Sequence, residues 1–378
     1  MARVAQALVV LSALAAAIVP IDNDRIEHGY SLSVYPVIQR LVTPVSNLVP
    51  FAVFDVLTVV AAAVLIVASV IAVSRARAKR RFQPVAALLR SMATAAAVAY
   101  LVFLACWGLN YRRIPMAERL VLDRAAPTTE QVVKLGFEAI GHMNRLHDEA
   151  HRVGWNPDPR DDRPLLEAYA FVQERLGGDA AAVPGRLKST IYGPYFRWTS
   201  VDGMVNPFSL EVLANPDLLP FERTFVAAHE WAHLAGFADE AEANFAAWLT
   251  CIRAGPAAQY SGWLSLYWQI GAEADAENRQ RLWAAVAEGP RRDIQAITDR
   301  LRRGELPLLR RVSWRMFDGY LRANRVEEGV RSYGLVINLI LRARFEDGWV
   351  PVLRTSERRA RRRRFHRRNE GNGGRTEF

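Results

Sequence analysis

The sequence predicts a mainly α-helical protein in which three N-terminal transmembrane helices precede an α+β domain with a small β-sheet. Three long apolar runs lie before residue 112, and globular composition with helical periodicity follows them. Between residues 185 and 215 this periodicity gives way to short β-type stretches bounded by turn residues. We therefore divide the chain into a membrane domain, 1–111, a second domain, 112–353, and a charged tail, 354–378.

The three apolar runs cover residues of about 4–21, 51–73 and 85–111. The second and third contain so few charges for their length that a buried soluble helix is a weak alternative. A cleaved signal peptide is the alternative for the first run, but Arg3 alone precedes it as a positive charge. Because two further spans follow, we expect an uncleaved anchor and a multi-pass protein in the lipid bilayer of the cell membrane.

Basic residues predict the orientation of these spans. The linker after the first run carries Arg25 and Arg40, which three acidic residues offset. The positive-inside rule then places the more basic linker, 74–84, in the cytoplasm and everything after Tyr111 outside. Trp107 and Tyr111 are expected in an aromatic belt at the membrane surface. The basic residues of the cytoplasmic linker are Arg75, Arg77, Lys79, Arg80 and Arg81.

The formal net charge of +10 is concentrated in the tail, where ten Arg against three Glu leave about +3 for the rest of the chain. So small a remainder gives no reason to propose a nucleic-acid partner. The tail is expected to be disordered, either as a solvated end or as a segment that binds anionic lipid or cell-wall polymer. Cys106 and Cys251 are too few for a disulfide framework, so core packing must hold the fold.

A histidine pair in the second domain indicates metal chemistry. His229 and His233 lie four residues apart, so on a helix their rings project from one face and can share a metal ion. Glu230 follows the first histidine, where it can reach a water on the metal without binding the ion itself. This spacing predicts one zinc ion per chain, with Glu230 as the catalytic residue.

Catalytic zinc usually takes a third protein ligand and leaves one position open. Asp239 has the spacing of a metzincin-like third ligand, whereas Glu240 and Glu242 fit a gluzincin-like pattern. Gly236 is expected to end the helix that carries the histidines, and Asp239 to cap the next helix. Glu240 would then face the histidine pair, so we predict Glu240 as the third ligand, Glu242 as the second choice and Asp239 as the third.

A second pair with the same spacing, His147 and His151, has Asp148 where the first pair has its glutamate. Its neighbours are polar and no carboxylate cluster follows closely, so we interpret this pair as a solvated helix face.

The chain resembles a bacterial membrane family, the domain-of-unknown-function family 3810, over nearly its whole length. The resemblance implies an extracytoplasmic zincin-type domain behind transmembrane helices, favours Glu240 and Glu242 over Asp239, and brings no known substrate. It rests on segments that occur in order: YSLSVYPVIQRLVTPVSNLVPF, LACWGLNYRRIP, MVNPFSLEVLAN, HEWAHLAGFADEAEANF, YSGWLSLYW and DGYLRANRVEEGVRSYGLVINLIL.

Together these patterns predict a membrane-anchored zinc metallopeptidase that hydrolyses peptide bonds of an extracytoplasmic protein or peptide. Glu230 would take a proton as water attacks the scissile carbonyl, which zinc polarises, and pass it to the leaving amine. The β-type stretch 204–213 would pair with an extended substrate, with Asn206, Ser209 and Glu211 as candidate contacts. Candidate oxyanion donors are Tyr260, Tyr267, Tyr320 and Tyr333.

Two other functions fit the same residues. One is a non-enzymatic membrane receptor or scaffold with a structural zinc site, which would need four protein ligands. The other is a zinc amidase that acts on cell-wall peptide and differs from a peptidase only in its substrate.

Overall fold

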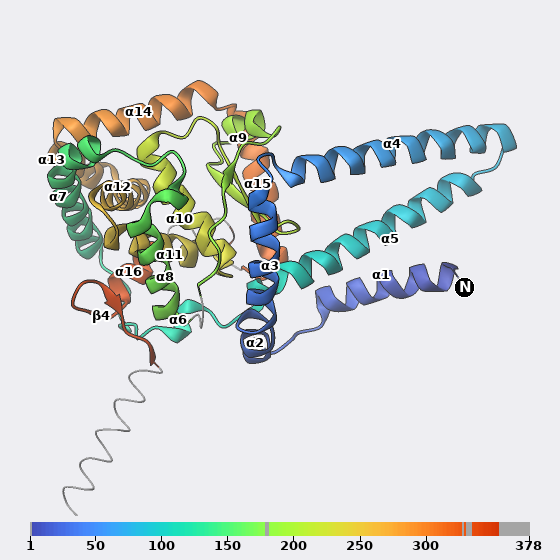
Figure 1. Ribbon diagram of the computed structural model, residues 1–378, viewed down its shortest axis with the longest axis horizontal. Coiled ribbons are helices and arrows are strands. Elements are labelled where there is room, and N and C mark those ends of the chain that lie inside the picture. The colour runs from blue at the N-terminus through green and yellow to red at the C-terminus, as the bar shows by residue number, and fades with distance from the viewer. Residues whose placement is uncertain (1, 178–180, 327–328, 330–334, 355–378) are drawn as a thin grey trace, which may run out of the picture.

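The computed structural model describes residues 2–177, 181–326, 329 and 335–354. The Arg-rich tail beyond Arg354 lies outside the described residues, so the prediction of disorder there stays a prediction. The described chain is mainly helical, and Figure 1 shows a helical body from which α1 (Ala2–Ile18), α4 (Val53–Lys79) and α5 (Gln83–Cys106) project together. α5 packs against both α1 and α4.

Two of the projecting helices, α4 and α5, are long and apolar enough to cross a membrane. α1 has 17 residues, and it bends by 115° into the segment Asn23–Ser31, which comprises α2 (Asn23–Ile26) and the π-helix η1 (Glu27–Ser31). α1 alone is therefore too short to be counted with α4 and α5 as a candidate span. A third candidate span exists only if α1 and the bent segment after it are counted as one.

The expected boundaries of two spans were wrong. α1 ends at Ile18 rather than residue 21, because Pro20 disfavours helical geometry in the residue before it. α5 ends at Cys106 rather than residue 111, and Gly108–Arg112 form a 3-10 helix, η2. Trp107 leaves the helix to pack beside His233, where it is 6% exposed, so it does not belong to a membrane-surface belt.

Between α1 and α4 the chain forms α3 (Val34–Leu48), a helix that was not predicted from the sequence. Its polar side chains face the body: Gln39 donates to the carbonyl of Val183 and accepts from its amide, and the Thr43 hydroxyl donates to the carbonyl of Leu210. Five of its apolar side chains, among them Leu41 and Leu48, are instead exposed, the reverse of a helix on a soluble domain.

A three-stranded sheet lies beside this helix. β1 (Leu187–Lys188) pairs with β3 (Glu211–Ala214) in parallel, and β2 (Gly203–Asn206) pairs with β3 antiparallel, with Met204 opposite Leu213. The order β1-β3-β2 leaves β2 at an edge. The predicted small sheet is confirmed, but α9 (Gly193–Thr199) was not expected between β1 and β2.

The carboxylate of Glu211 joins this sheet to α4. It pairs with Lys188 at 2.8 Å, both side chains being 0% exposed, and accepts hydrogen bonds from the first two backbone amides of α4. A carboxylate is favourable at this position because the first amides of a helix have no partner within it. Ser209 and Asn206 are buried and hydrogen-bond within this network. The interpretation of Asn206, Ser209 and Glu211 as substrate contacts was therefore wrong.

The remaining helices form the body. A break at residues 286–287 separates α13 from α14, and Pro290 follows it in the first turn of α14, where its missing N–H costs nothing. An unforeseen break follows α12 at residues 274–275. The bounds are α6 (Met116–Arg119), α7 (Thr129–Val153), η3 (Pro159–Asp161), α8 (Arg163–Arg175), α10 (Pro220–Leu234), α11 (Glu240–Arg253), α12 (Pro256–Glu273), α13 (Ala276–Ala285), α14 (Glu288–Gly304), α15 (Pro307–Ala323), α16 (Leu335–Arg342), and the antiparallel pair β4 (Phe345–Glu346) and β5 (Val350–Pro351).

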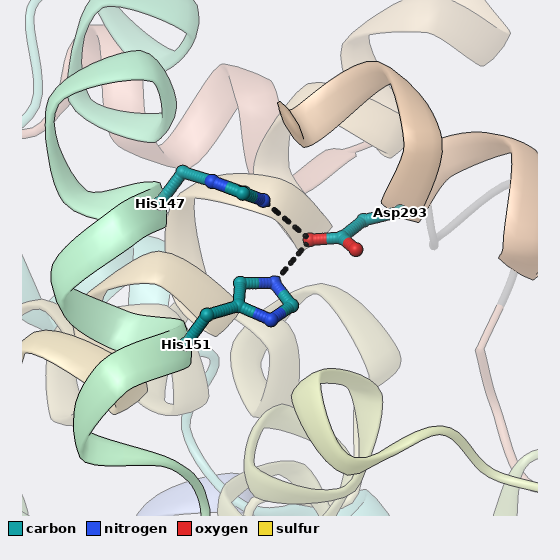
Figure 2. Close-up of side chains that lie close together, drawn as sticks. All are labelled: His147, His151 and Asp293. Carbon is teal, nitrogen blue, oxygen red and sulfur yellow. Dashed lines mark hydrogen bonds and ion pairs between the residues drawn. The ribbon is translucent and has the colours of Figure 1, made fainter. Parts of the chain in front are cut away.

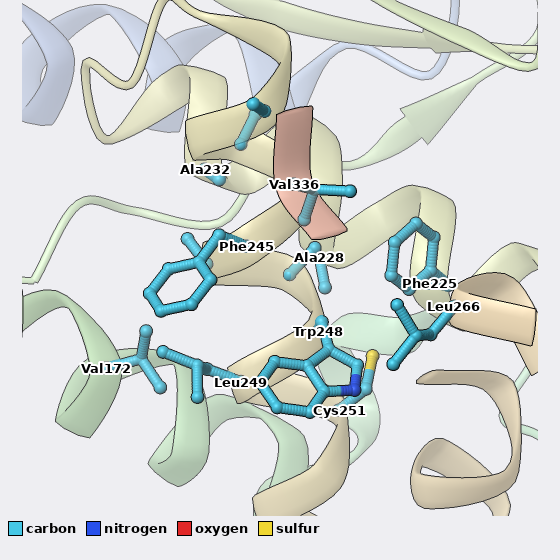
Figure 3. Packing of buried hydrophobic residues seen from close by; sticks show 14 of the residues in the cluster. Val172, Phe225, Ala228, Ala232, Phe245, Trp248, Leu249, Cys251, Leu266 and Val336 are labelled. Atoms are coloured by element: carbon cyan, nitrogen blue, oxygen red, sulfur yellow. The ribbon is translucent and has the colours of Figure 1, made fainter. Parts of the chain in front are cut away.

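The hydrophobic core is centred on α10, α11 and α12, whose buried side chains interlock as Figure 3 shows for Phe225, Trp248 and Leu266. Every residue of α11 from Glu240 to Cys251 is buried. A helix buried on all sides is held in place by its neighbours, and truncating one such large side chain typically costs about 3–5 kcal/mol. The polar groups at the start of α11 are therefore held on a rigid element.

Candidate metal centre

The histidine pair lies on α10, whose apolar side is buried in the core. Gly236 adopts a left-handed backbone conformation (φ 87°) that ends this helix. Asp239 then caps α11, its carboxylate accepting from the backbone amides of Ala241 (2.9 Å) and Glu242 (3.1 Å). The predicted helix end and helix cap are both confirmed, and the short connection brings the start of α11 against the histidine face of α10.

Three donor atoms converge at this junction. Nε2 of His229 and Nε2 of His233 lie 3.1 Å apart, and Oε2 of Glu240 lies 3.3 Å from the first and 3.5 Å from the second. A tetrahedral zinc ion with bonds of about 2.0–2.1 Å separates its ligand atoms by roughly 3.3–3.4 Å. The triangle formed by His229, His233 and Glu240, called the donor triangle below, therefore has the dimensions that such an ion requires.

The hydrogen bonds around the donor triangle also fit a cation. Nδ1 of His233 lies 2.7 Å from the carbonyl oxygen of Phe237, so it carries the proton and Nε2 presents its lone pair to the centre. Oε2 of Glu240 is buried and makes no hydrogen bond, although it lies close to both imidazoles. Buried polar atoms without a partner are costly, and a cation bound among the three donors would remove that cost.

The charges of the donor-triangle residues shift one another's pKa values. Burial alone would lower the pKa of His233, but Glu240 and Glu230 raise it to about 9. Burial alone would raise the pKa of Glu240, but the charges of His233 and His229 hold it well below its usual range. Without metal, a proton on the imidazole thus compensates the carboxylate, and a bound divalent ion would displace that proton.

Glu230 lies beside the donor triangle and is 3% exposed. Burial, together with the negative charge of Glu240, raises its pKa, and its Oε2 has no hydrogen-bond partner among the described residues. The edge strand β2 passes directly against it: a Cβ added to Gly203 would lie 2.5 Å from Oε1 of Glu230. A buried carboxylate with a free oxygen thus lies beside the donor triangle and against strand β2 at Gly203.

The other two candidate ligands point elsewhere. Oε1 of Glu242 accepts a hydrogen bond from the backbone amide of Met116, at the start of α6. Asp239 is engaged as the cap of α11, and burial and the charge of Glu242 raise its pKa. Of the three carboxylates, only Glu240 belongs to the donor triangle.

One residue of α3 and two residues that follow α5 hold the carboxyl end of α10, and sequence reasoning missed their role. Nε1 of Trp107 donates to the carbonyl of His233 (3.0 Å), the Tyr35 hydroxyl to that of Leu234 (2.8 Å), and Nη1 of Arg113 to that of Gly236 (3.0 Å). The last carbonyls of a helix need such partners. Arg113 is itself held by Glu27 in a buried ion pair of 2.7 Å. The N-terminal helical segment and the donor triangle are thus directly connected.

Among the candidate oxyanion donors, Tyr320 of α15 lies close enough to Glu240 for the charge of that carboxylate to act on it. Burial and the negative charge of Glu240 raise the pKa of Tyr320 to about 12, although a hydrogen bond with Tyr111 opposes the shift. Tyr260 is buried elsewhere and donates to Asp293, and Tyr333 lies outside the described residues. The donor-triangle side chains are only 13%, 10% and 7% exposed, so access to the centre is narrow.

The second histidine pair is not a solvated helix face, as the sequence had indicated. The side chain of His147 is 13% exposed, and both His147 and His151 approach the carboxylate of Asp293 on α14. That residue lies more than a hundred positions further along the chain, so no local pattern could have revealed the contact.

A family model described as "Protein of unknown function (DUF3810)" matches residues 30–341 of the chain. No curated protein and no solved structure matches the chain. The matched segment contains α4, α5, the whole donor triangle and Glu230. Because the match covers well over half of the sequence, the chain belongs to the DUF3810 family.

Proposed function

We propose that this protein is a membrane-anchored zinc metallopeptidase that cleaves an extracytoplasmic peptide or protein. One observation carries the proposal: Nε2 of His229, Nε2 of His233 and Oε2 of Glu240 converge to within 3.1–3.5 Å beside the buried carboxylate of Glu230. Two imidazoles, one carboxylate and an adjacent general base form the donor set of hydrolytic zinc sites.

The number of ligands favours an enzyme over a scaffold with a structural zinc. Structural zinc sites fill four positions with protein ligands, whereas catalytic sites use three and keep one open. Among the described residues, this cluster contains three. Cys251, the one cysteine of α11, is fully buried in the core and does not belong to it.

The chemistry proposed for Glu230 follows from its position. A zinc ion held by the donor triangle would polarise a substrate carbonyl and lower the pKa of water to about 7. Glu230, with its raised pKa, would accept the proton of the attacking water and deliver it to the leaving amine. The Tyr320 hydroxyl is a proton donor suited to stabilising the oxyanion.

The edge strand β2 is the proposed peptide-binding element. Its free edge could pair with an extended segment by backbone hydrogen bonds, which is a common mode of peptide recognition. Because Gly203 at the start of β2 contacts Glu230, a peptide on this edge would pass the general base. This arrangement supports a peptide rather than a small-molecule substrate.

The proposed orientation follows from the connection between α4 and α5, which lies far from the body (Figure 1). Its basic residues favour the cytoplasmic side by the positive-inside rule. The body, and with it the donor triangle, would then lie outside the cytoplasm.

The test compares wild type with Glu230→Gln in zinc-loaded protein, using a quenched-fluorescence peptide library as the probe. Loss of a general base typically costs about 10²–10⁴-fold in rate. We expect a loss of this size with zinc content unchanged. Glu288→Gln, at a position whose side chain is 86% exposed, is the matched control and should keep full activity. Hydrolysis by Glu230→Gln at the wild-type rate would contradict the proposal, and so would a zinc-loaded wild type that cleaves no peptide.

A further inference from the structure

A second cluster of metal-ligating side chains lies between α7 and α14, apart from the donor triangle. Figure 2 shows His147 and His151 projecting from successive turns of α7 toward Asp293 of α14. Nε2 of His151 lies 2.8 Å from Oδ2 of Asp293, and Nε2 of His147 lies 3.6 Å from the same oxygen. The three donor atoms all lie within 4.8 Å of one another. A small shift of these three side chains would place their donor atoms around one ion.

Hydrogen bonds orient these groups toward a common centre. Nδ1 of His147 lies 2.8 Å from Oδ1 of Asp148, which holds the proton on Nδ1 and turns the lone pair of Nε2 toward Asp293. That lone pair then faces an anionic oxygen, an arrangement that a cation between them would stabilise. The Tyr260 hydroxyl supports the carboxylate by donating to Oδ2 at 2.6 Å.

The backbone allows this close approach. A Cβ added to Gly289, in the first turn of α14, would lie 2.4 Å from Cε1 of His147, so a larger residue there would displace the imidazole. The side chains of His147 and Asp293 are 13% and 10% exposed, whereas that of His151 is 38% exposed. The cluster is thus enclosed except at His151, where an ion could enter.

We propose that His147, His151 and Asp293 bind a second divalent transition-metal ion, for which zinc fits best. Two imidazole nitrogens and one carboxylate oxygen are the ligands that zinc takes in proteins. Asp148 is engaged with Nδ1 of His147, so no residue here corresponds to Glu230. The second ion would tie α7 to α14, and this inference does not depend on the proposed peptidase activity.

The test uses the full chain in detergent, purified with a tag that contains no histidine. The His233→Ala/Glu240→Ala variant removes two ligands of the donor triangle, so a stoichiometric ion that remains must lie elsewhere. We expect this variant to keep about one zinc per chain at micromolar free zinc, measured by mass spectrometry of the metal and by competition with a chromogenic chelator. Adding either His151→Ala or Asp293→Asn should abolish that binding.

A matched control comes from the same helix. His142 stacks on Trp263 at 4.1 Å and does not belong to the cluster, so His142→Ala should leave the second ion in place. Circular dichroism establishes that each variant is folded. A folded His233→Ala/Glu240→Ala variant that keeps no zinc would overturn the inference. Zinc lost with His151→Ala but unaffected by His233→Ala would support this site and contradict the first one.

A separate observation concerns the junction between the body and the projecting helices. α3 exposes an apolar stripe that includes Leu41 (66%) and Leu48 (83%), and α15 exposes one that includes Leu308 (74%) and Met316 (73%). Figure 1 shows both helices running across the direction of α4 and α5, at the point where these leave the body. α3 leads directly into α4, so its exposed stripe is continuous with the surface that faces lipid.

We infer that α3 and α15 lie in the membrane interface, with their apolar stripes in contact with lipid. The test attaches a fluorophore to single cysteines at positions 41, 64, 288 and 316, after replacing Cys106 and Cys251, in nanodiscs with nitroxide-labelled lipid. We expect quenching at 41 and 316 as at 64, which lies within α4, and none at the exposed position 288 of α14. Quenching at 64 alone would overturn the inference.

Discussion

Replacing Gly203 with alanine tests whether Glu230 and the edge strand form one working unit. The added Cβ would lie 2.5 Å from Oε1 and 3.0 Å from Cγ and Cδ of Glu230, whereas ordinary contacts begin at 3.4 Å. Gly203 does not have a positive φ, so alanine itself fits the backbone. Either the carboxylate or strand β2 must therefore move by about 0.9 Å. A misplacement of this size typically costs about 10²-fold in rate.

We expect Gly203→Ala to lower peptide turnover by about a hundredfold, or roughly 2.7 kcal/mol, while zinc content stays that of the wild type. The zinc should stay because the three atoms nearest to the added Cβ all belong to Glu230, which is not one of the proposed zinc ligands. Turnover is measured with the quenched-fluorescence peptide library and zinc by mass spectrometry. Gly271→Ala in α12 is the control, since nothing lies within 4 Å of its added Cβ. A folded, zinc-loaded Gly203→Ala that turns over as fast as wild type would refute the reasoning.

Three further predictions concern the surroundings of the site. The pKa of His233 is about 9, and zinc must displace the proton that this imidazole holds. Zinc affinity should therefore rise about tenfold per pH unit from pH 7 and level off above pH 9. A flat pH profile, measured by chelator competition, would contradict this prediction. Lys188→Met leaves the carboxylate of Glu211 buried without its counter-charge and should lower the free energy of unfolding by about 3–5 kcal/mol in urea titrations; unchanged stability would show that the ion pair is dispensable. Tyr35→Phe leaves the carbonyl of Leu234 without its hydrogen bond and should cost about 1–3 kcal/mol in the same assay, whereas a smaller loss would mean that water replaces the hydroxyl.

Much of the donor triangle could be predicted from sequence because its geometry is local. A spacing of four residues places His229 and His233 on one helix face, and a glycine followed by a capping aspartate fixes where Glu240 begins the next helix. Both signals lie within a dozen residues. The preference for Glu240 over Glu242 could be argued for the same reason.

The contacts that support the site were beyond prediction because they are made across long stretches of chain. Trp107 and Arg113 follow an apolar run, where an aromatic belt and interfacial arginines are the ordinary interpretation. Their actual partners are carbonyls at the end of α10, more than a hundred residues away. Every residue has a backbone carbonyl, so the sequence at the end of α10 does not indicate which side chains its carbonyls accept from.

α3 was missed because its pattern is inverted. Its polar side chains, including Gln39 and Thr43, are 0% exposed against the body, whereas Leu41 and Leu48 face outward. A helical pattern is usually interpreted by assuming that the apolar face is buried in protein. That assumption fails for a helix whose polar face contacts the protein and whose apolar face contacts lipid.

The central claim is that the donor triangle binds zinc, and the metal content of the purified protein tests it most directly. Wild type is compared with His233→Ala, Glu240→Ala and Glu242→Ala, each under gentle, chelator-free purification. The account predicts that His233→Ala and Glu240→Ala each lose one zinc per chain relative to wild type and that Glu242→Ala keeps it. Zinc retained in folded His233→Ala and Glu240→Ala at the wild-type level, or a wild type without zinc, would contradict the account.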